Sequence, residues 1–549
     1  MREQSPLERL TLICYVAGAL SFPQRISEPE NAGVYFAGMI PTANSETIPR
    51  LGRDLALVLF LAAVIAFAFQ GSRGLFESTE GRYAEAAREM LETGNWLVPQ
   101  LDYHPHWTKP PVTYWAIAGG MALLGQNEWG VRLYNALAFI AIVWAVARLG
   151  TLLWDKRTGL AASLIYAVSP FAVYAASSVQ TDVLLSLAQI LVVVSYFEAL
   201  KCPEAPAAQR WVILLYLFAG IAFLIKGPPA LLTPIVIAAY HFYRRRRRLP
   251  TVRLSSLPGI VCFVAVGLSW FLLVVMESRG LLSYFLRNEV AARIFTAQAE
   301  RNPQWYGPFV VYLPVLLFGL GPIAIMWVVL ARRYRPIIRW TSFKHLFLLN
   351  DRAAFLILWL GAPVVVLSLV RSRLPLYLLP FFPVIALAMA RTLVLLYDFP
   401  KLRRQLWSMA LAMGFALIAA KAALAYVPVK SDMRRFHAEC VQMGSPDAAY
   451  FVHDSTKLYG LQFYLDGHLT RLWDRLPPPE GQPDARTVLA RLKTNPENRA
   501  CVFIDTSRKH EGELGALLDQ MGFAYDLRRS EAGYALFVVH PPVLSAQSR

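Results

Sequence analysis

Two glutamates with a neighbouring arginine and tyrosine follow directly after an apolar segment of this sequence: Glu77, Glu80, Arg82 and Tyr83. A pair of carboxylates in such a place is suited to general-base work. The residues from Glu80 onward are rich in Ala, Glu and Arg, which predicts a helix. At its start, Thr79 and Glu80 would instead be a cap and a negative charge that the helix dipole favours. Both interpretations are open for Glu80, and Tyr83 is a further candidate for the lining of the site.

Two further groups of residues offer positive charge at turns. Lys109 stands before two prolines, which fix the backbone and aim the ammonium group from a rigid turn. The alternative is an exposed lysine whose apolar stem covers the surface. Arg371, Arg373 and Tyr377 belong to a tight turn between two strongly apolar segments. Arginine binds phosphate well through paired hydrogen bonds, so this turn is a candidate phosphate site.

Four more ionisable residues are candidates for a polar cavity. Glu289 and Arg293 are four positions apart, so they form either a simple helical ion pair or, in the case of Arg293, an anion ligand. Asp182 and Lys226 stand at two other turns. They either complete the cavity or pair with each other.

The composition requires membrane spans to position these residues. Of the 549 residues, 56% are hydrophobic and 17% are charged, and the mean hydropathy is +0.41. A soluble fold, with about 45–50% apolar residues, cannot bury this excess. Apolar runs of about 17–25 residues can cross the hydrocarbon core, which predicts about eleven helical spans. They lie near residues 54–70, 131–153, 158–176, 183–200, 211–225, 228–243, 257–276, 309–331, 353–370, 376–397 and 405–427. A shorter apolar stretch, 114–125, is predicted to be a re-entrant or interfacial helix.

The distribution of positive charge predicts the orientation of these spans. Alternate loops between them hold 19 of the 54 Lys and Arg residues, five of these in the run Arg244–Arg248, and are therefore predicted to face the cytoplasm. The transmembrane domain would then cover residues 51–427, with the long loops 71–130 and 277–308 on the outer side. The net charge of +17 is thus a signal of topology. The arginine run lacks the interleaved aromatic residues typical of nucleic-acid binding.

The two ends of the chain differ from the apolar middle. Residues 1–50 are predicted to be an extension of unknown role, either disordered or the result of a start codon placed too early, with Met39 as the true start; a weak signal peptide is the alternative. Residues 428–549 alternate strand-like and helical stretches, which predicts a small α/β domain on the outer side. Cys440 and Cys501 lie there, as a disulfide or as two thiols.

The charged clusters together predict a site at the outer membrane face that binds an anion and holds one or two carboxylates. A lipid phosphate suits such a site, because its tail would occupy a groove between spans while its phosphate lies among cations. The residues alone do not distinguish a transferase from a transporter.

The motifs around these residues resemble the bacterial lipid-linked sugar transferases of the GT-C fold, the superfamily of aminoarabinose transferases and protein O-mannosyltransferases, glycosyltransferase family 39-like. The resemblance covers roughly residues 54–400 and is specific in the first outer loop. The matching stretches are 74–90, 94–99, 109–115, 128–138, 181–182, 226–228, 304–306 and 372–380.

This resemblance implies a polytopic membrane protein of the GT-C fold, with about 11–13 transmembrane helices in the bacterial inner membrane. It implies transfer of a sugar from a polyprenyl-phosphate donor to a cell-envelope acceptor (lipid A, glycan or protein) on the periplasmic side, with inversion at the anomeric carbon. The first-loop acidic residue, Glu77 or Glu80, would be the base. Lys109 and Tyr377 would contact the lipid phosphate, with Arg82 and Arg293 nearby.

Several positions depart from the pattern of aminoarabinose transferases. Thr79 precedes Glu80 where an Asp is typical, and Arg373 stands where a lysine is common. Thr108 and Val290 replace a Glu and a His, so we expect no metal site built on those positions. No other cofactor is expected. These departures favour a related transferase with another sugar or acceptor. The protein is expected to act as a monomer.

The alternative function is a flippase or transporter of polyprenyl phosphate or a lipid-linked sugar. It predicts charges throughout the span interiors and an internal inverted repeat, and the sequence displays neither.

Overall fold

The computed structural model describes most of the chain in two compact units. The described residues are 48–77, 79–201, 203–204, 206–278, 280–287, 301–321, 350–444, 447–455, 457–474, 483–494, 500–506 and 511–540. Unit 1 comprises residues 1–66, 137–176 and 181–417, and unit 2 comprises residues 67–136, 177–180 and 418–549. Glu289, Arg293 and most of the N-terminal extension lie outside the described residues.

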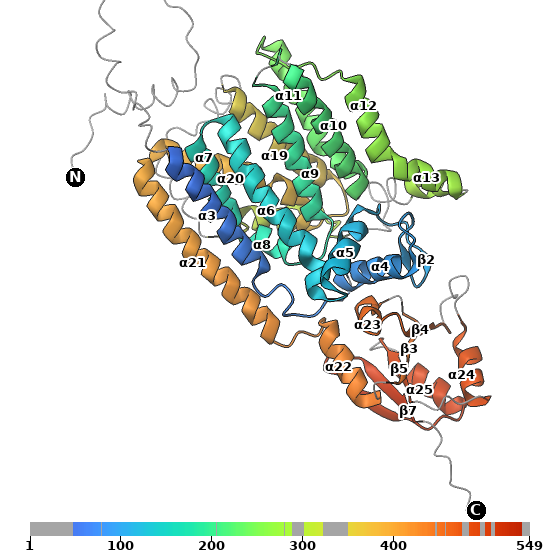
Figure 1. Ribbon diagram of the computed structural model, residues 1–549. Helices are drawn as coiled ribbons and strands as arrows, with labels where there is room; N and C mark the ends of the chain where they lie inside the picture. The colour runs from blue at the N-terminus through green and yellow to red at the C-terminus, as the bar shows by residue number, and fades with distance from the viewer. Residues whose placement is uncertain are drawn as a thin grey trace, which may run out of the picture. The chain divides into compact units, whose positions relative to one another are not determined.

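Unit 1 is a bundle of apolar helices (Figure 1). Its helices are α3 (Ile48–Phe67), most of α6 (Glu128–Leu153), α7 (Lys156–Ala167), α8 (Pro170–Ala176), α9 (Asp182–Ala199), α10 (Pro206–Lys226), η2 (Pro228–Leu231), α11 (Leu232–Arg246), α12 (Leu257–Phe263), η3 (Val264–Leu268), α13 (Ser269–Glu277), α14 (Leu281–Tyr284), α16 (Gly307–Phe318), α19 (Asp351–Leu369), η7 (Pro375–Phe381), α20 (Phe382–Leu396) and the first part of α21 (Phe399–Tyr426). Helix α9 packs against α10, and α7 packs against α20.

The predicted membrane spans coincide with these helices. Seven helical segments among the described residues are long and apolar enough to cross a membrane, or eight if the bent pair α7 and α8 forms one span. That pair bends by 62° at residues 168–169, directly before Pro170, because the residue that precedes a proline is disfavoured in the α conformation. The prediction of a polytopic helical membrane protein is confirmed.

Three predicted spans do not reach the length or composition of a crossing helix over their described residues. Two prolines turn the start of the span near 228–243 into the 3₁₀ helix η2, which leaves 15 residues for α11. The described part of α16 has 12 residues, and α3 carries charged residues in its first two turns. The predicted re-entrant or interfacial helix corresponds to α5 (Val112–Leu124), whose 13 apolar residues are too few for an untilted crossing.

Unit 2 combines the first outer loop with the C-terminal part of the chain. The loop contributes α4 (Thr79–Thr93), the short antiparallel pair β1 (Gln100–Leu101) and β2 (His104–Pro105), and α5. The C-terminal part contains the elements α22 (Met433–Gly444), β3 (Ala449–His453), α23 (Tyr459–Tyr464), β4 (Leu469–Leu472), α24 (Ala485–Thr494), β5 (Cys501–Asp505), α25 (Glu511–Gln520), β6 (Asp526–Arg529) and β7 (Ala535–Val539).

These C-terminal strands form one five-stranded sheet in the order β4-β3-β5-β7-β6. Strand β3 is parallel to β4 and β5, and the pairs β5–β7 and β7–β6 are antiparallel. The predicted small α/β domain is therefore confirmed. Cys440 packs in the core on one face of the sheet and Cys501 in the core on the other, so no disulfide joins these two described cysteines.

Candidate active site

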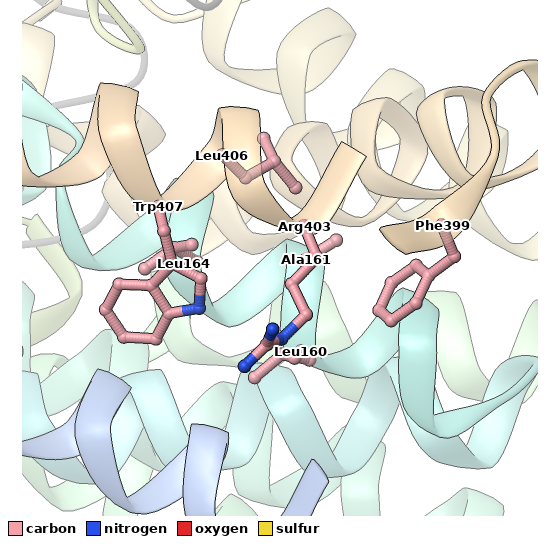
Figure 2. A pocket seen from close by; sticks show the side chains of 7 residues that line it. All are labelled: Leu160, Ala161, Leu164, Phe399, Arg403, Leu406 and Trp407. Carbon is pink, nitrogen blue, oxygen red and sulfur yellow. The ribbon is translucent and has the colours of Figure 1, made fainter. Parts of the chain in front are cut away.

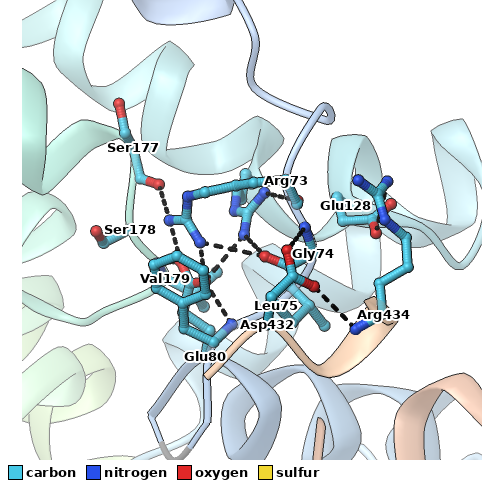
Figure 3. Close-up of polar contacts among 12 residues, drawn as sticks. Arg73, Gly74, Leu75, Glu80, Glu128, Ser177, Ser178, Val179, Asp432 and Arg434 are labelled. Atoms are coloured by element: carbon cyan, nitrogen blue, oxygen red, sulfur yellow. Dashed lines mark hydrogen bonds and ion pairs between the residues drawn. The ribbon is translucent and has the colours of Figure 1, made fainter. Parts of the chain in front are cut away.

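Glu80 lies at the centre of a buried ion-pair network in unit 2 (Figure 3). Its carboxylate accepts hydrogen bonds from Arg73 at 2.7 and 3.0 Å and from Arg132 at 2.9 Å. The backbone N–H groups of Phe76 and Val179 also donate to it, each at 2.9 Å. Burial alone would raise the pKa of Glu80, but the charges of Arg132 and Arg73 lower it to about 2. A carboxylate with so many donors and so low a pKa is a poor proton acceptor at neutral pH.

The two arginines of this network also bind backbone oxygens. Arg132 donates to the carbonyls of Gln70 and Arg73, each at 2.9 Å, and to that of Gly74 at 2.8 Å. The network therefore fixes the segment that leads to α4. Neither arginine is among the predicted site residues, although the position of Arg132 inside a predicted span is a signal of buried pairing.

Glu77 has a different environment from Glu80. Its Oε2 atom accepts the backbone N–H of Gly460 at 2.9 Å. Its Oε1 atom is shielded from solvent and has no hydrogen-bond partner among the described residues. Burial raises the pKa of Glu77 above its ordinary value, against the opposing effects of the backbone N–H groups of Gly460 and Leu458 and of the charges of Arg471 and Arg82. Glu77 thus combines an unengaged oxygen with a raised pKa, which are the properties of a general base.

The positive charges of Arg82 and Lys109 both act on His106, a histidine that was not among the residues predicted from the sequence. The Nε2 atom of His106 lies 2.6 Å from Oγ1 of Thr108, and Lys109 Nζ donates to the Thr108 carbonyl at 2.9 Å. Burial, together with the charges of Arg82 and Lys109, lowers the pKa of His106 to about 4, so the ring is neutral at pH 7. The structure thus brings two predicted cations of the first loop into one electrostatic environment, while Tyr83 is buried. A histidine within three residues of Lys109 is the signal that could have found it.

The candidates in unit 1 form two separate groups. Asp182 and Lys226 pair with each other at 2.5 Å, which is one of the two predicted alternatives. The Lys226 ammonium group lies 4.6 Å from the centre of the Tyr377 ring. These three residues therefore form one cluster that combines a carboxylate, a cation and a phenol.

Arg373 is occupied by backbone oxygens. Its guanidinium group is buried and donates to the carbonyls of Asn302 at 2.8 Å, Gln304 at 2.9 Å and Ser368 at 2.9 Å. These hydrogen bonds of Arg373 therefore connect the segment before α16 with the turn between α19 and η7. Arg371, by contrast, is exposed to solvent.

Removal of the Arg373 side chain is expected to destabilise the protein by about 1–3 kcal/mol, because three carbonyl oxygens lose their donor. The exposed Arg371 is the matched control, and Arg371→Ala should change stability by less than about 0.5 kcal/mol. The measurement is the midpoint of thermal unfolding of each purified variant in detergent. Equal midpoints for Arg373→Ala and Arg371→Ala would contradict this role for Arg373.

Two hollows in the structure contain none of the predicted site residues. A narrow crevice of about 10 Å³ lies between α7 and α21, with Arg403 in its lining (Figure 2). Arg403 also pairs with Asp54 at 2.5 Å. A larger hollow of about 340 Å³ lies along the edge strand β4 and is lined by His468 and Arg491 among others. Within the described part of the chain, no three His, Cys, Asp or Glu side chains are grouped to hold a metal ion.

Comparison with known proteins identifies the fold. The family model described as dolichyl-phosphate-mannose-protein mannosyltransferase matches residues 108–270. The crystal structure of ArnT from Cupriavidus metallidurans bound to undecaprenyl phosphate superimposes with a TM-score of 0.68, at 18% identity, over 88% of this chain and 97% of that one. The chain therefore has the GT-C fold, as predicted.

Sequence relatives indicate the class of enzyme that the chain resembles. The chain is 30% identical to the undecaprenyl phosphate-alpha-4-amino-4-deoxy-L-arabinose arabinosyl transferase of Pseudomonas savastanoi pv. phaseolicola. The alignment extends over 346 residues and covers 62% of this chain and 61% of that protein. The transferase of the same name from Pseudomonas aeruginosa is 30% identical over 369 residues, 66% of this chain and 63% of that protein. The predicted similarity to lipid-linked sugar glycosyltransferases is confirmed. The chain spans about three fifths of the length of these relatives.

Proposed function

We propose that this protein transfers a sugar from a polyprenyl-phosphate donor to a cell-envelope acceptor, with Glu77 as the general base. The observation that carries the proposal is the environment of Glu77, whose Oε1 is shielded from solvent and has no partner among the described residues. Support also comes from the relatives, whose names describe an undecaprenyl-phosphate sugar transferase. In this proposal the reaction takes place on the periplasmic side of the inner membrane.

The chemistry requires one proton transfer and one displacement. Glu77 takes the proton of an acceptor hydroxyl, whose oxygen attacks the anomeric carbon of the donor sugar in line with the bond to phosphate. That bond breaks, the anomeric carbon is inverted, and the polyprenyl phosphate leaves with the bonding electrons. Arg82 and Lys109 would stabilise the charge of the leaving phosphate, which needs no proton at neutral pH.

Other predicted donor ligands fit this proposal to different degrees. Tyr377 lies beside the Lys226 ammonium group and Arg371 is exposed to solvent, whereas Arg373 donates to the three carbonyls described above. Whether each residue binds the donor is tested by the effect of its substitution on donor affinity. We expect Tyr377→Phe and Lys109→Ala each to weaken the binding of undecaprenyl phosphate to the purified protein.

The substrates to be tested are chosen from the names of the relatives and from the departures in the first loop. An aminoarabinose donor with lipid A as acceptor is the first combination to test, because the relatives carry that sugar in their names. Thr79 and Thr108 replace acidic residues of the aminoarabinose transferase pattern, so donors with other sugars and acceptors such as glycans and proteins belong in the same test.

The experiment uses the full-length protein in lipid vesicles. It is given a panel of labelled polyprenyl-phosphate sugars with each acceptor, and the release of polyprenyl phosphate and the label on the acceptor are measured. We expect equal molar amounts of both products with at least one pair. Movement of a lipid probe across the bilayer without any sugar transfer would overturn the proposal in favour of transport, and inertness across the panel would also count against it.

A further inference from the structure

The backbone that carries Glu77 is paired with the segment that enters the C-terminal domain. Phe76 and Asp432 form an antiparallel bridge, and the Glu77 N–H donates to the Ser431 carbonyl at 3.0 Å. The Asp432 carboxylate accepts the N–H of Gly74 at 3.1 Å (Figure 3). Gly74 and Glu77 therefore have their backbone N–H groups satisfied by residues 431–432, some 350 positions later in the chain.

The side chain of Glu77 is held by helix α23. Gly460, the second residue of α23, donates its N–H to Glu77 Oε2 at 2.9 Å. This contact depends on a close approach between α4 and α23 at Gly81. A Cβ atom on Gly81 would lie 2.4 Å from the nitrogen and 2.5 Å from the Cα atom of Gly460, closer than non-bonded atoms approach, and 3.1 Å from Oε2 of Glu77. Only glycine fits at position 81 with α23 in its present place.

A half-buried and a buried side chain, those of Tyr464 and Arg471, fix α23 itself. Tyr464, its last residue, donates its hydroxyl hydrogen to Glu128 at 2.7 Å and accepts the N–H of Leu75 at 2.9 Å. Arg471 is buried and donates to the carbonyls of Ser455 at 2.8 Å and Lys457 at 2.7 Å, in the loop directly before α23.

Arg471 also connects this loop to the first outer loop, because it pairs with Asp102 at 2.6 Å. The position of α23 is thus determined both by residues of the C-terminal domain and by residues of the first outer loop.

We infer that the C-terminal α/β domain is part of the catalytic machinery, because α23 holds the Glu77 carboxylate in the position and ionisation state in which it takes the acceptor proton. Gly81, Gly460 and Tyr464 are positioning residues in this inference. The inference rests on the proposed function, in which Glu77 is the base. It assigns the domain a role in positioning the base, in place of only covering the site or only binding the acceptor.

The decisive variant is Gly81→Ala, which adds one methyl group against the Gly460 nitrogen. Gly119→Ala is the matched control, because Gly119 also lies in a helix of unit 2 and a Cβ atom there meets nothing within 4 Å. The alanine in itself favours both helices, so a loss confined to Gly81→Ala reports crowding at the place where α4, Glu77 and α23 meet. Tyr464→Phe separates the effect of α23 from direct crowding of Glu77, because Tyr464 contacts Glu128 and Leu75 instead. Tyr464→Phe is the milder second variant, because it removes one hydroxyl group and keeps the ring.

We expect kcat of Gly81→Ala to fall by about 10–100-fold, the cost of a misplacement of about 1 Å, while the affinity for undecaprenyl phosphate is retained. The acid limb of the pH profile of kcat/KM should move to higher pH, because the Gly460 N–H favours the ionised carboxylate and its loss raises the pKa of Glu77. Arg82 and Arg471 are the charged groups that act on Glu77, and neither is changed. Tyr464→Phe should shift the profile in the same direction by less.

Retained binding of undecaprenyl phosphate serves as the control that a variant is folded. If Gly81→Ala and Tyr464→Phe bind the lipid and keep the wild-type kcat and pH profile while Glu77→Gln is inactive, the role of α23 is refuted and the proposed function stands. If Gly81→Ala does not fold, the profile of Tyr464→Phe alone decides the outcome. A wild-type protein that transfers no sugar, or a fully active Glu77→Gln, would overturn the proposed function and this inference with it.

Discussion

Glu77→Gln is expected to lower kcat by about 10²–10⁴-fold, the usual contribution of a positioned general base. Glutamine keeps the shape of the side chain and can still accept the Gly460 N–H through its carbonyl oxygen, so the local structure should persist. The affinity for undecaprenyl phosphate should be unchanged, because Glu77 acts on the acceptor hydroxyl and not on the donor. The measurement is the rate of sugar transfer at saturating donor, alongside a direct binding assay.

The same residue predicts the pH dependence of the wild-type enzyme. The base works only when ionised, and burial raises the pKa of Glu77. Activity should therefore be lost as the pH falls through the raised pKa of Glu77, which lies above the ordinary value of a glutamate. The residual activity of Glu77→Gln should lack this acid limb of the pH profile.

Glu92→Gln is the control for Glu77→Gln, since the Glu92 side chain is 49% exposed and lies at the far end of α4. It should keep the wild-type rate and profile. Transfer that survives in a Glu77→Gln, Glu80→Gln double variant would remove the carboxylate mechanism altogether.

The elements that position the site could be predicted from the sequence because their signals are local. Apolar runs of span length and alternating strand and helix patterns each depend on residues that are neighbours in the chain. The bend between α7 and α8 has a local cause in Pro170 as well, yet it interrupts a single apolar run and was not predicted. The shortening of the span near 228–243 has the same origin in two prolines.

The roles of the two first-loop glutamates could not be distinguished in this way. Glu77 and Glu80 are three positions apart, and the sequence around them is equally consistent with a cap, an ion pair or a base. Their difference comes from distant partners: Arg132 and Val179 for Glu80, and Gly460 for Glu77. Such contacts follow from the tertiary structure, and no pattern within the loop encodes them.

The cations illustrate the same limit. Two arginines at one turn, Arg371 and Arg373, are equivalent by type and spacing, and both were predicted to bind phosphate. In the structure Arg373 is buried among backbone carbonyls while Arg371 is exposed. A charged residue at the end of a span therefore marks a place where polar groups converge, and only its partners show whether they belong to the fold or to a ligand.

Loss of the Glu80 carboxylate is expected to have the largest effect on stability. Glu80→Ala would leave the guanidinium groups of Arg73 and Arg132 buried beside each other without a counter-charge. Breaking a buried ion pair on one side costs about 3–5 kcal/mol. We therefore expect a large drop in the midpoint of thermal unfolding in detergent, or failure to accumulate in the membrane. Glu92→Gln, which removes an exposed partner of Arg88, should cost no more than about 1 kcal/mol.

The pH dependence of stability separates this role of Glu80 from a catalytic one. Its pKa of about 2 in the folded protein lies below the ordinary value of 4.5, so the folded state favours the ionised carboxylate. The resulting stabilisation is fully present above pH 4.5 and is lost as the pH falls from there toward 2. Between pH 5 and pH 9 the contribution of Glu80 to the unfolding midpoint should not change with pH, whereas the activity should change as Glu77 titrates above the ordinary value of a glutamate. If the difference in stability between the wild type and Glu80→Ala titrated near neutral pH, Glu80 would be a proton acceptor after all, and Glu77 would have a rival for the role of base.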